Sequence, residues 1–216
     1  SRKNLQPTLE DLLPRILAKR EAKTDAGRGA GRGRMPAGAQ HARKPIRTTP
    51  VRPVHRLDRD TSGLMVVART VPAERVLGAQ FREHTTSRRY LAVAEGAVTA
   101  QTFGTADPEA GKKAITHVRP LESFDGYTLV ECRLETGRTH QIRIHLSEAG
   151  HPLCGEKVYR HAAFQPPSVD RSGAPRLALH AAELGFEHPH TGEPMRFTMP
   201  LPADLQSFLA RLRNRH

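Results

Sequence analysis

A carboxylate flanked by two arginines stands in the stretch His-Arg-Leu-Asp-Arg-Asp-Thr-Ser-Gly-Leu at residues 55–64. Arg56 and Arg59 on either side of Asp58 favour its ionised form, because nearby positive charges stabilise a carboxylate. A positioned, ionised carboxylate can act as a nucleophile or as a general base. The same residues could instead form an Asx turn with surface ion pairs, so both interpretations are kept at this point.

A second group of polar residues follows a glycine at residues 136–145, Thr-Gly-Arg-Thr-His-Gln-Ile-Arg-Ile-His. Gly137 predicts a turn that presents backbone N–H groups at the start of a helix. The side chains of Arg138 and Arg143 add positive charge there, and the combination suits a phosphate. An ordinary cationic helix face is the alternative interpretation.

No metal or nucleotide cofactor is expected. His140 and His145 are five residues apart, a spacing that does not place both on one helix face for a metal ion. No HExxH or CxxC motif accompanies them. The Gly/Arg run at residues 27–34 has neither the Lys-Ser/Thr pair of a phosphate-binding loop nor a following helix.

The elements that must position these residues alternate irregularly between strands and helices. Leu64–Ala68 is a continuous apolar run that predicts a buried strand directly after Asp58. Thr139 is expected to cap a helix that runs to Ala149, with Gly150 as its C′ residue. Further strands are expected at Tyr90–Ala94, Tyr127–Leu134, Leu177–Phe186 and Met195–Thr198. Further helices are expected from Thr70 or Val71, with Pro72 in the first turn, and at Asp204–Leu212. This order favours an α+β fold with a mixed, mostly antiparallel central sheet and flanking helices.

The charge balance favours a polyanionic partner. The chain of 216 residues has 34 Lys plus Arg against 22 Asp plus Glu, a net charge of +12. Residues 1–53 are expected to form a basic, partly flexible segment with a short helix at Thr8–Leu17, either an electrostatic arm for RNA or a solvated linker. Residues 54–216 are expected to form one catalytic domain.

Other features fit the reducing cytoplasm, and a monomer is the default expectation. Cys132 and Cys154 are far apart and predict no disulfide framework. No apolar run is long enough for a membrane span, and no signal peptide is visible. The scarcity of aromatic residues argues against a simple single-strand-binding surface.

Taken together, these stretches resemble the RluA family of pseudouridine synthases, which isomerise uridine in RNA. Residues 55–64 match the family's signature HRLD-x-x-TSGL, where the sister RsuA type has Gly-Arg-Leu-Asp. Similar stretches follow in the family's order at residues 88–93, 138–145, 150–156, 179–181, 186–189 and 200–202. The resemblance therefore covers about residues 54–205. The family's Lys-Pro motif usually precedes a Leu-rich helix, whereas Lys44-Pro45 follows it here, so the chain either lacks an N-terminal part or represents a diverged branch.

The resemblance implies a cofactor-free RNA pseudouridine synthase with ribosomal RNA as the favoured substrate and transfer RNA as a possible one. Asp58 matches the catalytic aspartate, Tyr90 the tyrosine near the target base, and Arg143 the arginine that pairs with the aspartate. Arg56 matches the arginine that replaces the flipped uridine in the RNA stack. The residues expected to contact RNA are His55, Arg56, Arg59, Arg138 and His140.

Two other functions remain open at this point. A non-catalytic RNA-binding module would use the basic arm and the arginine clusters alone. A metal-dependent nuclease would use Asp58, Asp60 and histidines, and its strand cleavage would be sensitive to chelators. Neither explains why the matched motifs occur together in order.

Overall fold

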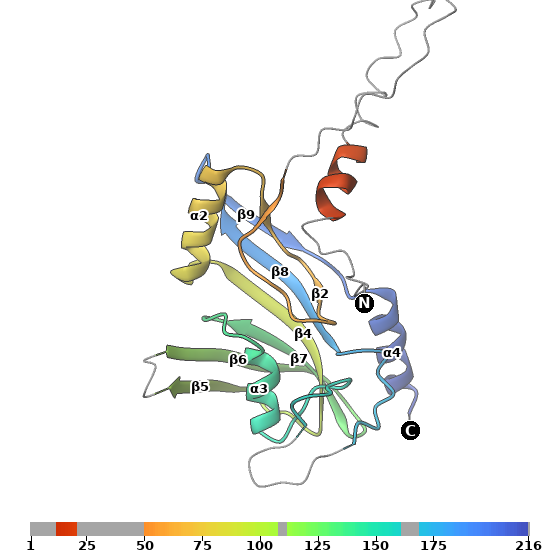
Figure 1. Cartoon of the computed structure of the whole chain (residues 1–216). Coiled ribbons are helices and arrows are strands. Elements are labelled where there is room, and N and C mark those ends of the chain that lie inside the picture. The colour runs from red at the N-terminus through yellow and green to blue at the C-terminus, as the bar shows by residue number, and fades with distance from the viewer. Residues whose placement is uncertain (1–11, 21–49, 108–111, 161–168, 216) are drawn as a thin grey trace, which may run out of the picture.

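The computed structural model describes residues 12–20, 50–107, 112–160 and 169–215 (Figure 1). A first helix covers residues 12–20. The elements that follow are β1 (Arg52–Pro53), β2 (Ser62–Gly63), β3 (Val67–Ala68), α2 (Val71–Arg82), β4 (Ser87–Glu95), β5 (Gln101–Asp107), β6 (Lys112–Phe124), β7 (Tyr127–Leu134), α3 (Gln141–Glu148), β8 (Leu179–Glu187), β9 (Pro194–Thr198) and α4 (Ala203–Arg213). In this part of the chain, no helix combines the length and the apolar character needed to cross a membrane.

A seven-stranded sheet forms the centre of the molecule. Its strand order is β2-β8-β4-β7-β6-β5, and β9 also pairs with β8. The β2–β8 pair is parallel, and the other pairs of this sheet are antiparallel. The expected α+β fold with a mixed, mostly antiparallel sheet is therefore confirmed.

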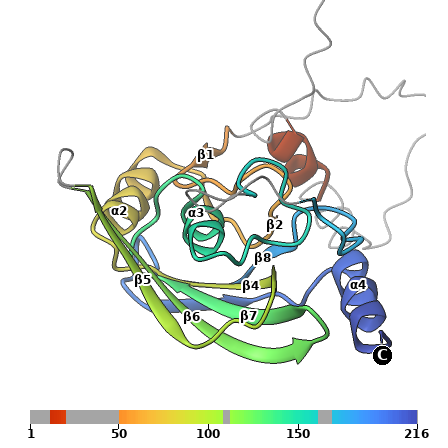
Figure 2. The same ribbon diagram turned by 90° about the horizontal axis from the view of Figure 1, so that it is seen from below.

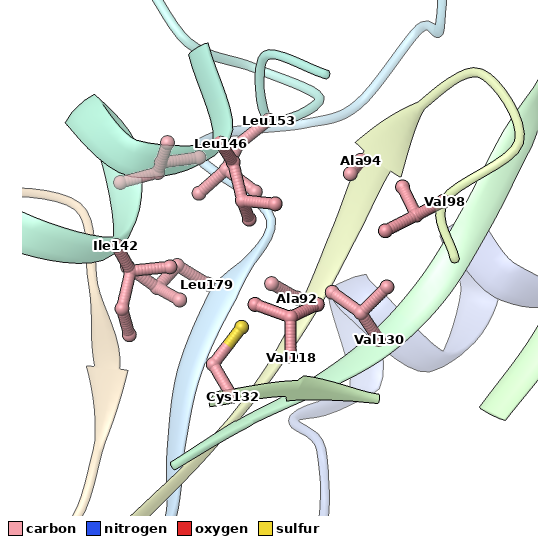
Figure 3. Close-up of a cluster of buried hydrophobic side chains, with 11 residues drawn as sticks. Ala92, Ala94, Val98, Val118, Val130, Cys132, Ile142, Leu146, Leu153 and Leu179 are labelled. Atoms are coloured by element: carbon pink, nitrogen blue, oxygen red, sulfur yellow. The ribbon is translucent and has the colours of Figure 1, made fainter. Parts of the chain in front are cut away.

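Two hydrophobic clusters cover the two faces of this sheet. On one face, Ile142 and Leu146 of α3 pack against Ala92 of β4 and Val130 of β7 (Figure 3). Because successive side chains of a strand point to opposite faces, Val93 belongs to the other cluster, which α4 completes. Figure 2 shows α2 and α3 inside the curve of the sheet and α4 apart from them. The inner face, beside α3, is the face that carries the candidate site.

The apolar run Leu64–Ala68 is not the continuous strand that the sequence predicts. Its neighbour β2 pairs with β8, whereas β3 pairs with β1 in a separate two-stranded sheet. Between them, the Leu64 amide donates to the Ala181 carbonyl at 2.9 Å and the Val66 amide donates to His55 Nε2 at 3.0 Å. The chain thus changes partners within five residues, which an apolar pattern does not indicate.

The start of α3 also differs from the prediction. Its N-cap residue is His140, in the left-handed region at φ 55°, and no side chain caps the helix, so the expected cap at Thr139 is wrong. Gly150 has φ 82° just after the helix, as a C′ residue requires. At α2 the Thr70 hydroxyl accepts from the Ala73 amide at 3.3 Å, which confirms the expected helix start.

The strands β5 and β6 were not predicted, although β6 is thirteen residues long. Their sequences are rich in polar and charged residues, and β6 contains Pro120 beside a register shift. Alternate residues of β6 nevertheless point inward, with Thr116 and Val118 buried. Period-two alternation was therefore the available signal for β6.

The N-terminal prediction is only partly inside the described residues. Thr8, the expected cap, and the Gly/Arg run at residues 27–34 lie outside them. In the described helix, Leu12 and Ile16 are 40% and 50% exposed, so the expected apolar face is not fully covered. The boundary at residue 53 stays a prediction, and β1 pairs with β3 immediately before it.

Gly63→Ala is expected to destabilise the protein strongly. Gly63 has φ 120°, and a Cβ there would lie 2.3 Å from the Ala181 carbonyl oxygen, so the β2–β8 contact would have to open. We expect a loss of at least about 2 kcal/mol in the free energy of unfolding, measured by urea denaturation. Gly104→Ala is the matched control, because nothing lies within 4 Å of the added Cβ and φ is not positive. Equal stability of the two variants would contradict this account.

Candidate active site

A pocket of about 450 Å³ opens on the inner face of the sheet. The loop after β1, the end of α2, the start of β4 and the turn before α3 surround it. The predicted site residues that line it are His55, Arg56, Asp58, Tyr90, Arg138 and His140. Arg143 contacts Asp58 but is not a lining residue, and Arg59 is an exposed residue outside the lining. The structure therefore brings together residues that lie up to 85 positions apart in the sequence, His55 to His140.

The loop that carries Asp58 is a tight turn held from a distant part of the chain. The Thr61 amide donates to the Asp58 carbonyl at 3.0 Å, and Asp60 has φ 69°. Arg176 donates to the Asp60 carbonyl at 2.9 Å and to the Ser62 hydroxyl at 3.0 Å. Sequence reasoning missed Arg176, because a contact over more than 110 positions leaves no local pattern.

The carboxylate of Asp58 faces two positively polarised groups. Arg143 Nη1 lies 3.7 Å from Asp58 Oδ2, and His140 Nε2 lies 3.8 Å from Asp58 Oδ1. The Asp58 side chain is 16% exposed, so it remains reachable from the pocket. These distances allow electrostatic stabilisation of Asp58 while leaving its oxygens without a short side-chain hydrogen bond.

Arg143 is held primarily by Glu156. Its Nε and Nη2 each donate to a different carboxylate oxygen of Glu156 at 2.7 Å, the bidentate geometry that fixes an arginine most firmly. Its guanidinium also lies 5.1 Å from the centre of the Tyr159 ring. The hydrogen bonds that Arg143 donates to Glu156 raise the pKa of Arg143, with a further contribution from Asp58 and against the opposing effect of burial. Arg143 is therefore a fixed cation behind Asp58.

Glu156 was not among the predicted site residues. Its side chain is fully buried, and burial alone would raise its pKa. The hydrogen bonds from Arg143 and from the backbone amides of Val158 and Tyr159 outweigh this effect, so the pKa of Glu156 is lowered. The sequence does not indicate that Arg143 and Glu156, thirteen residues apart, form a pair. Their pairing depends on how the chain folds back after α3.

The turn before α3 is built around the buried side chain of Gln141. Its Oε1 accepts from the Arg138 amide at 2.9 Å and from the Thr136 hydroxyl at 2.8 Å, and its Nε2 donates to the Ile115 carbonyl at 2.9 Å. His140 Nδ1 shares a hydrogen bond of 2.8 Å with the Tyr159 hydroxyl. These contacts direct His140 Nε2 toward the Asp58 side and leave the Arg138 side chain exposed at the pocket.

Tyr90 lies on β4 at a register shift between Arg89 and Tyr90. Burial raises the pKa of Tyr90 to about 12; Arg88 acts in the opposite direction and Asp58 adds to the increase. The phenol is therefore neutral at physiological pH.

His55 has internal contacts in addition to its place in the pocket wall. Its Nε2 accepts from the Val66 amide at 3.0 Å, and its ring stacks on Phe81 with the ring centres 4.3 Å apart. Burial and, to a smaller extent, Arg88 lower the pKa of His55 to about 4. These contacts support a role in holding the loop, while the predicted RNA contact of His55 stays a prediction. Arg56 is exposed at the pocket.

Replacement of His55 by glutamine is expected to reduce the loss of folding stability that occurs as the pH is lowered below 7. The folded-state pKa of about 4 lies below the ordinary histidine value of 6.5. The unfolded chain therefore binds more protons between these two values, and stability falls as the pH is lowered through this window. At pH 5 the loss is on the order of 2 kcal/mol. Glutamine can still accept from the Val66 amide but does not titrate. The measurement is the melting temperature of wild type and of His55→Gln between pH 7 and 4.5. An equal decrease in both proteins would contradict the assignment.

No group of three or more His, Cys, Asp or Glu side chains that could hold a metal ion occurs within residues 12–20, 50–107, 112–160 and 169–215. The histidines near the pocket contact other groups. His140 is bonded to Tyr159, and His145 shares a hydrogen bond of 3.0 Å with the buried Thr116 hydroxyl.

Comparison with known proteins defines the class to which this sheet and pocket belong. The family model described as RNA pseudouridylate synthase matches residues 31–148. This match covers more than half of the chain, and the chain belongs to this family.

Its curated relatives place it beside the RluA-type enzymes, which confirms the resemblance seen in the sequence. It is 46% identical over 179 residues to the ribosomal large subunit pseudouridine synthase D of Neisseria meningitidis, covering 74% of this chain and 48% of the relative. It is 42% identical over 174 residues to the protein of the same name from Zymomonas mobilis, covering 71% of this chain and 53% of the relative. The chain thus spans about half the length of these relatives.

Solved structures agree on the fold. The human RNA pseudouridylate synthase domain containing 4 superposes with a TM-score of 0.63 at 24% identity, over 76% of each chain. The human RNA pseudouridylate synthase domain containing 1 gives a TM-score of 0.59 at 26% identity, over 76% of this chain and 80% of the other. The architecture of the sheet with its inner helices is therefore that of pseudouridine synthase domains.

Proposed function

We propose that this protein isomerises uridine to pseudouridine in ribosomal RNA and that Asp58 carries the chemistry. The observation that supports this most is the position of Asp58 in a cationic pocket, backed by the fixed guanidinium of Arg143 at 3.7 Å. A carboxylate that lines a pocket beside a fixed guanidinium is placed to act on a ligand that enters the pocket. Family membership supplies the reaction type.

The isomerisation breaks the N1–C1′ bond, turns the uracil and forms a C5–C1′ bond. The proton that leaves C5 is matched by one that N1 takes up, so the composition of the nucleoside is unchanged. Asp58 either adds to the nucleoside or removes a proton from it, and both routes need its carboxylate form. Arg143 stabilises that form. Tyr90, kept neutral by burial, would accept the C5 proton only while it passes its own hydroxyl proton to an acceptor, and Asp58, the carboxylate that lines the same pocket, is our candidate for that acceptor.

The substrate has to be extruded before it reaches Asp58. Taking a base out of an RNA stack costs a few kcal/mol, and this cost is offset when a side chain fills the gap. Arg56 is exposed at the pocket and is our candidate for this role. Arg138 and His140 at the same pocket, together with the exposed Arg59, are candidates for contacts with the RNA backbone. The names of the bacterial relatives favour ribosomal over transfer RNA.

This function can be tested with unmodified RNA made by transcription. Large-subunit ribosomal RNA and transfer RNA are incubated with the protein in the presence of a chelator, digested to nucleosides and analysed for pseudouridine by liquid chromatography. Pseudouridine in the ribosomal RNA is the expected result. Tight binding without pseudouridine would support a binding module instead, and chelator-sensitive strand cleavage would support a nuclease.

A further inference from the structure

Arg88 is a buried cation in the pocket wall that the proposed mechanism does not use. It lies on β4 two residues before Tyr90, and only 8% of its surface is exposed. Its Nη2 donates to the Glu135 carbonyl at 3.1 Å, and its guanidinium lies 6.0 Å from the centre of the Phe81 ring. Its Nε is buried and has no hydrogen-bond partner among the described residues.

The turn before α3 leaves room for this guanidinium. A Cβ added at Gly137 would lie 2.3 Å from Arg88 Nη1, although the backbone of Gly137 is not in the left-handed region. A larger residue at this position would therefore displace the guanidinium of Arg88 from its place in the pocket wall. Two distant segments, β4 and the turn that carries Arg138, are shaped around one arginine that also lines the pocket.

Two other arginines, one in the site and one in the same sheet, have carboxylate partners. Arg143 is bonded to Glu156 at 2.7 Å, and Arg89 lies 3.2 Å from Glu183 on the opposite face of the sheet. Arg88 has no carboxylate partner within the described residues, and burial lowers its pKa. A buried charge without an opposite charge is costly, because the lost hydration is not replaced. Such a group is stabilised when an anion binds beside it.

We propose that Arg88 binds a phosphate group of the nucleotide that enters the pocket. The inference rests on the proposed function, because it deepens the account of the same pocket. A phosphate fits better than a uracil carbonyl, since only a full negative charge compensates the buried cation. The pocket also has an excess of positive charge: Arg56, Arg82 and Arg138 line it along with Arg88, and Asp58 is the one carboxylate among its lining residues.

The test compares the binding of uridine 3′,5′-bisphosphate and of uridine to the whole protein, by NMR titration. Wild type is expected to prefer the bisphosphate, and Arg88→Gln is expected to reduce this preference by about tenfold, because one charge-assisted hydrogen-bond site is lost. The affinity for uridine itself should not change. Arg89→Gln is the matched control. Arg89 is the neighbour of Arg88 in β4, but its side chain lies on the opposite face of the sheet, so this variant should keep the wild-type preference for the bisphosphate.

The proposal would be overturned if wild type did not prefer the bisphosphate over uridine, or if folded Arg88→Gln kept the wild-type preference. It would also be overturned if Arg88→Gln lost affinity for both ligands equally, because this would indicate a contact with the uracil. Circular dichroism establishes whether Arg88→Gln is folded. If Arg88→Gln does not fold, Arg88→Lys is used instead. The preference of Arg88→Lys for the bisphosphate is expected to be at least about threefold below that of wild type, because a lysine does not reproduce the fork of the guanidinium. An unchanged preference would again overturn the proposal. Binding needs no turnover, so an Arg88-dependent preference in a protein that leaves ribosomal uridine unchanged would contradict the proposed function alone.

Discussion

Asp58→Asn is expected to reduce the single-turnover rate of uridine isomerisation by about 10³-fold or more. Asparagine has nearly the same shape, but its amide neither attacks carbon nor removes a proton. The side chain is partly accessible and lies 3.7 Å from Arg143, so the exchange removes the charge without creating a cavity. RNA affinity and thermal stability should remain close to those of wild type, because the contacts of the loop come from the Asp58 backbone and from Arg176.

The matched control for this variant is Asp60→Asn. Asp60 is the other carboxylate of the same turn, is exposed and has φ 69°, a conformation that asparagine adopts readily. Asp60 is not among the residues that line the pocket, so isomerisation should continue at the wild-type rate. An Asp58→Asn variant that retains a tenth of the wild-type rate, or an Asp60→Asn variant that is equally inactive, would contradict the assignment.

Glu156→Gln is expected to lower both stability and activity. The exchange removes the negative charge that holds Arg143, and a buried cation is left with Asp58 at 3.7 Å as its nearest carboxylate. Loss of one partner of a buried ion pair typically costs about 3–5 kcal/mol, to be measured by urea denaturation. In the molecules that remain folded, Arg143 would be drawn toward Asp58, and the rate of the chemical step should fall more than the affinity for RNA.

Glu74→Gln tests whether burial is the cause. Glu74 forms an ion pair of 3.1 Å with Arg52, but both side chains are close to 40% exposed. Exposed pairs contribute at most about 1 kcal/mol, so stability and activity should hardly change. Similar losses of stability and activity in Glu74→Gln and Glu156→Gln would show that the effect of Glu156→Gln does not depend on the burial of the ion pair.

The residues that the sequence singles out for chemistry do converge on one pocket. Asp58, Tyr90 and His140 come from three separate segments and meet there, as the motifs indicated. The sequence also predicted the start of α2 and the bounds of β7 correctly, because both depend on local patterns. Roles in catalysis and RNA binding remain proposals for each of these residues.

The supporting residues could not be predicted in the same way. Arg176 holds the Asp58 loop from more than 110 positions away, and Glu156 becomes a partner of Arg143 only when the chain turns back after α3. In the sequence, Arg88 stood out only as part of the stretch at residues 88–93. Its burial, and the lack of a carboxylate partner for it within the described residues, depend on how the whole sheet is assembled. Local periodicity also failed at Leu64–Ala68, where the chain changes sheets, because pairing partners are set by tertiary contacts.

The most direct test of the central claim is tritium release from ribosomal RNA labelled at C5 of uridine, measured for wild type and Asp58→Asn without metal or nucleotide, with RNA binding followed in parallel. Our account predicts release by wild type and none above background by Asp58→Asn, with equal binding of RNA by both proteins. Release at the same rate by both would show that Asp58 does not carry the reaction.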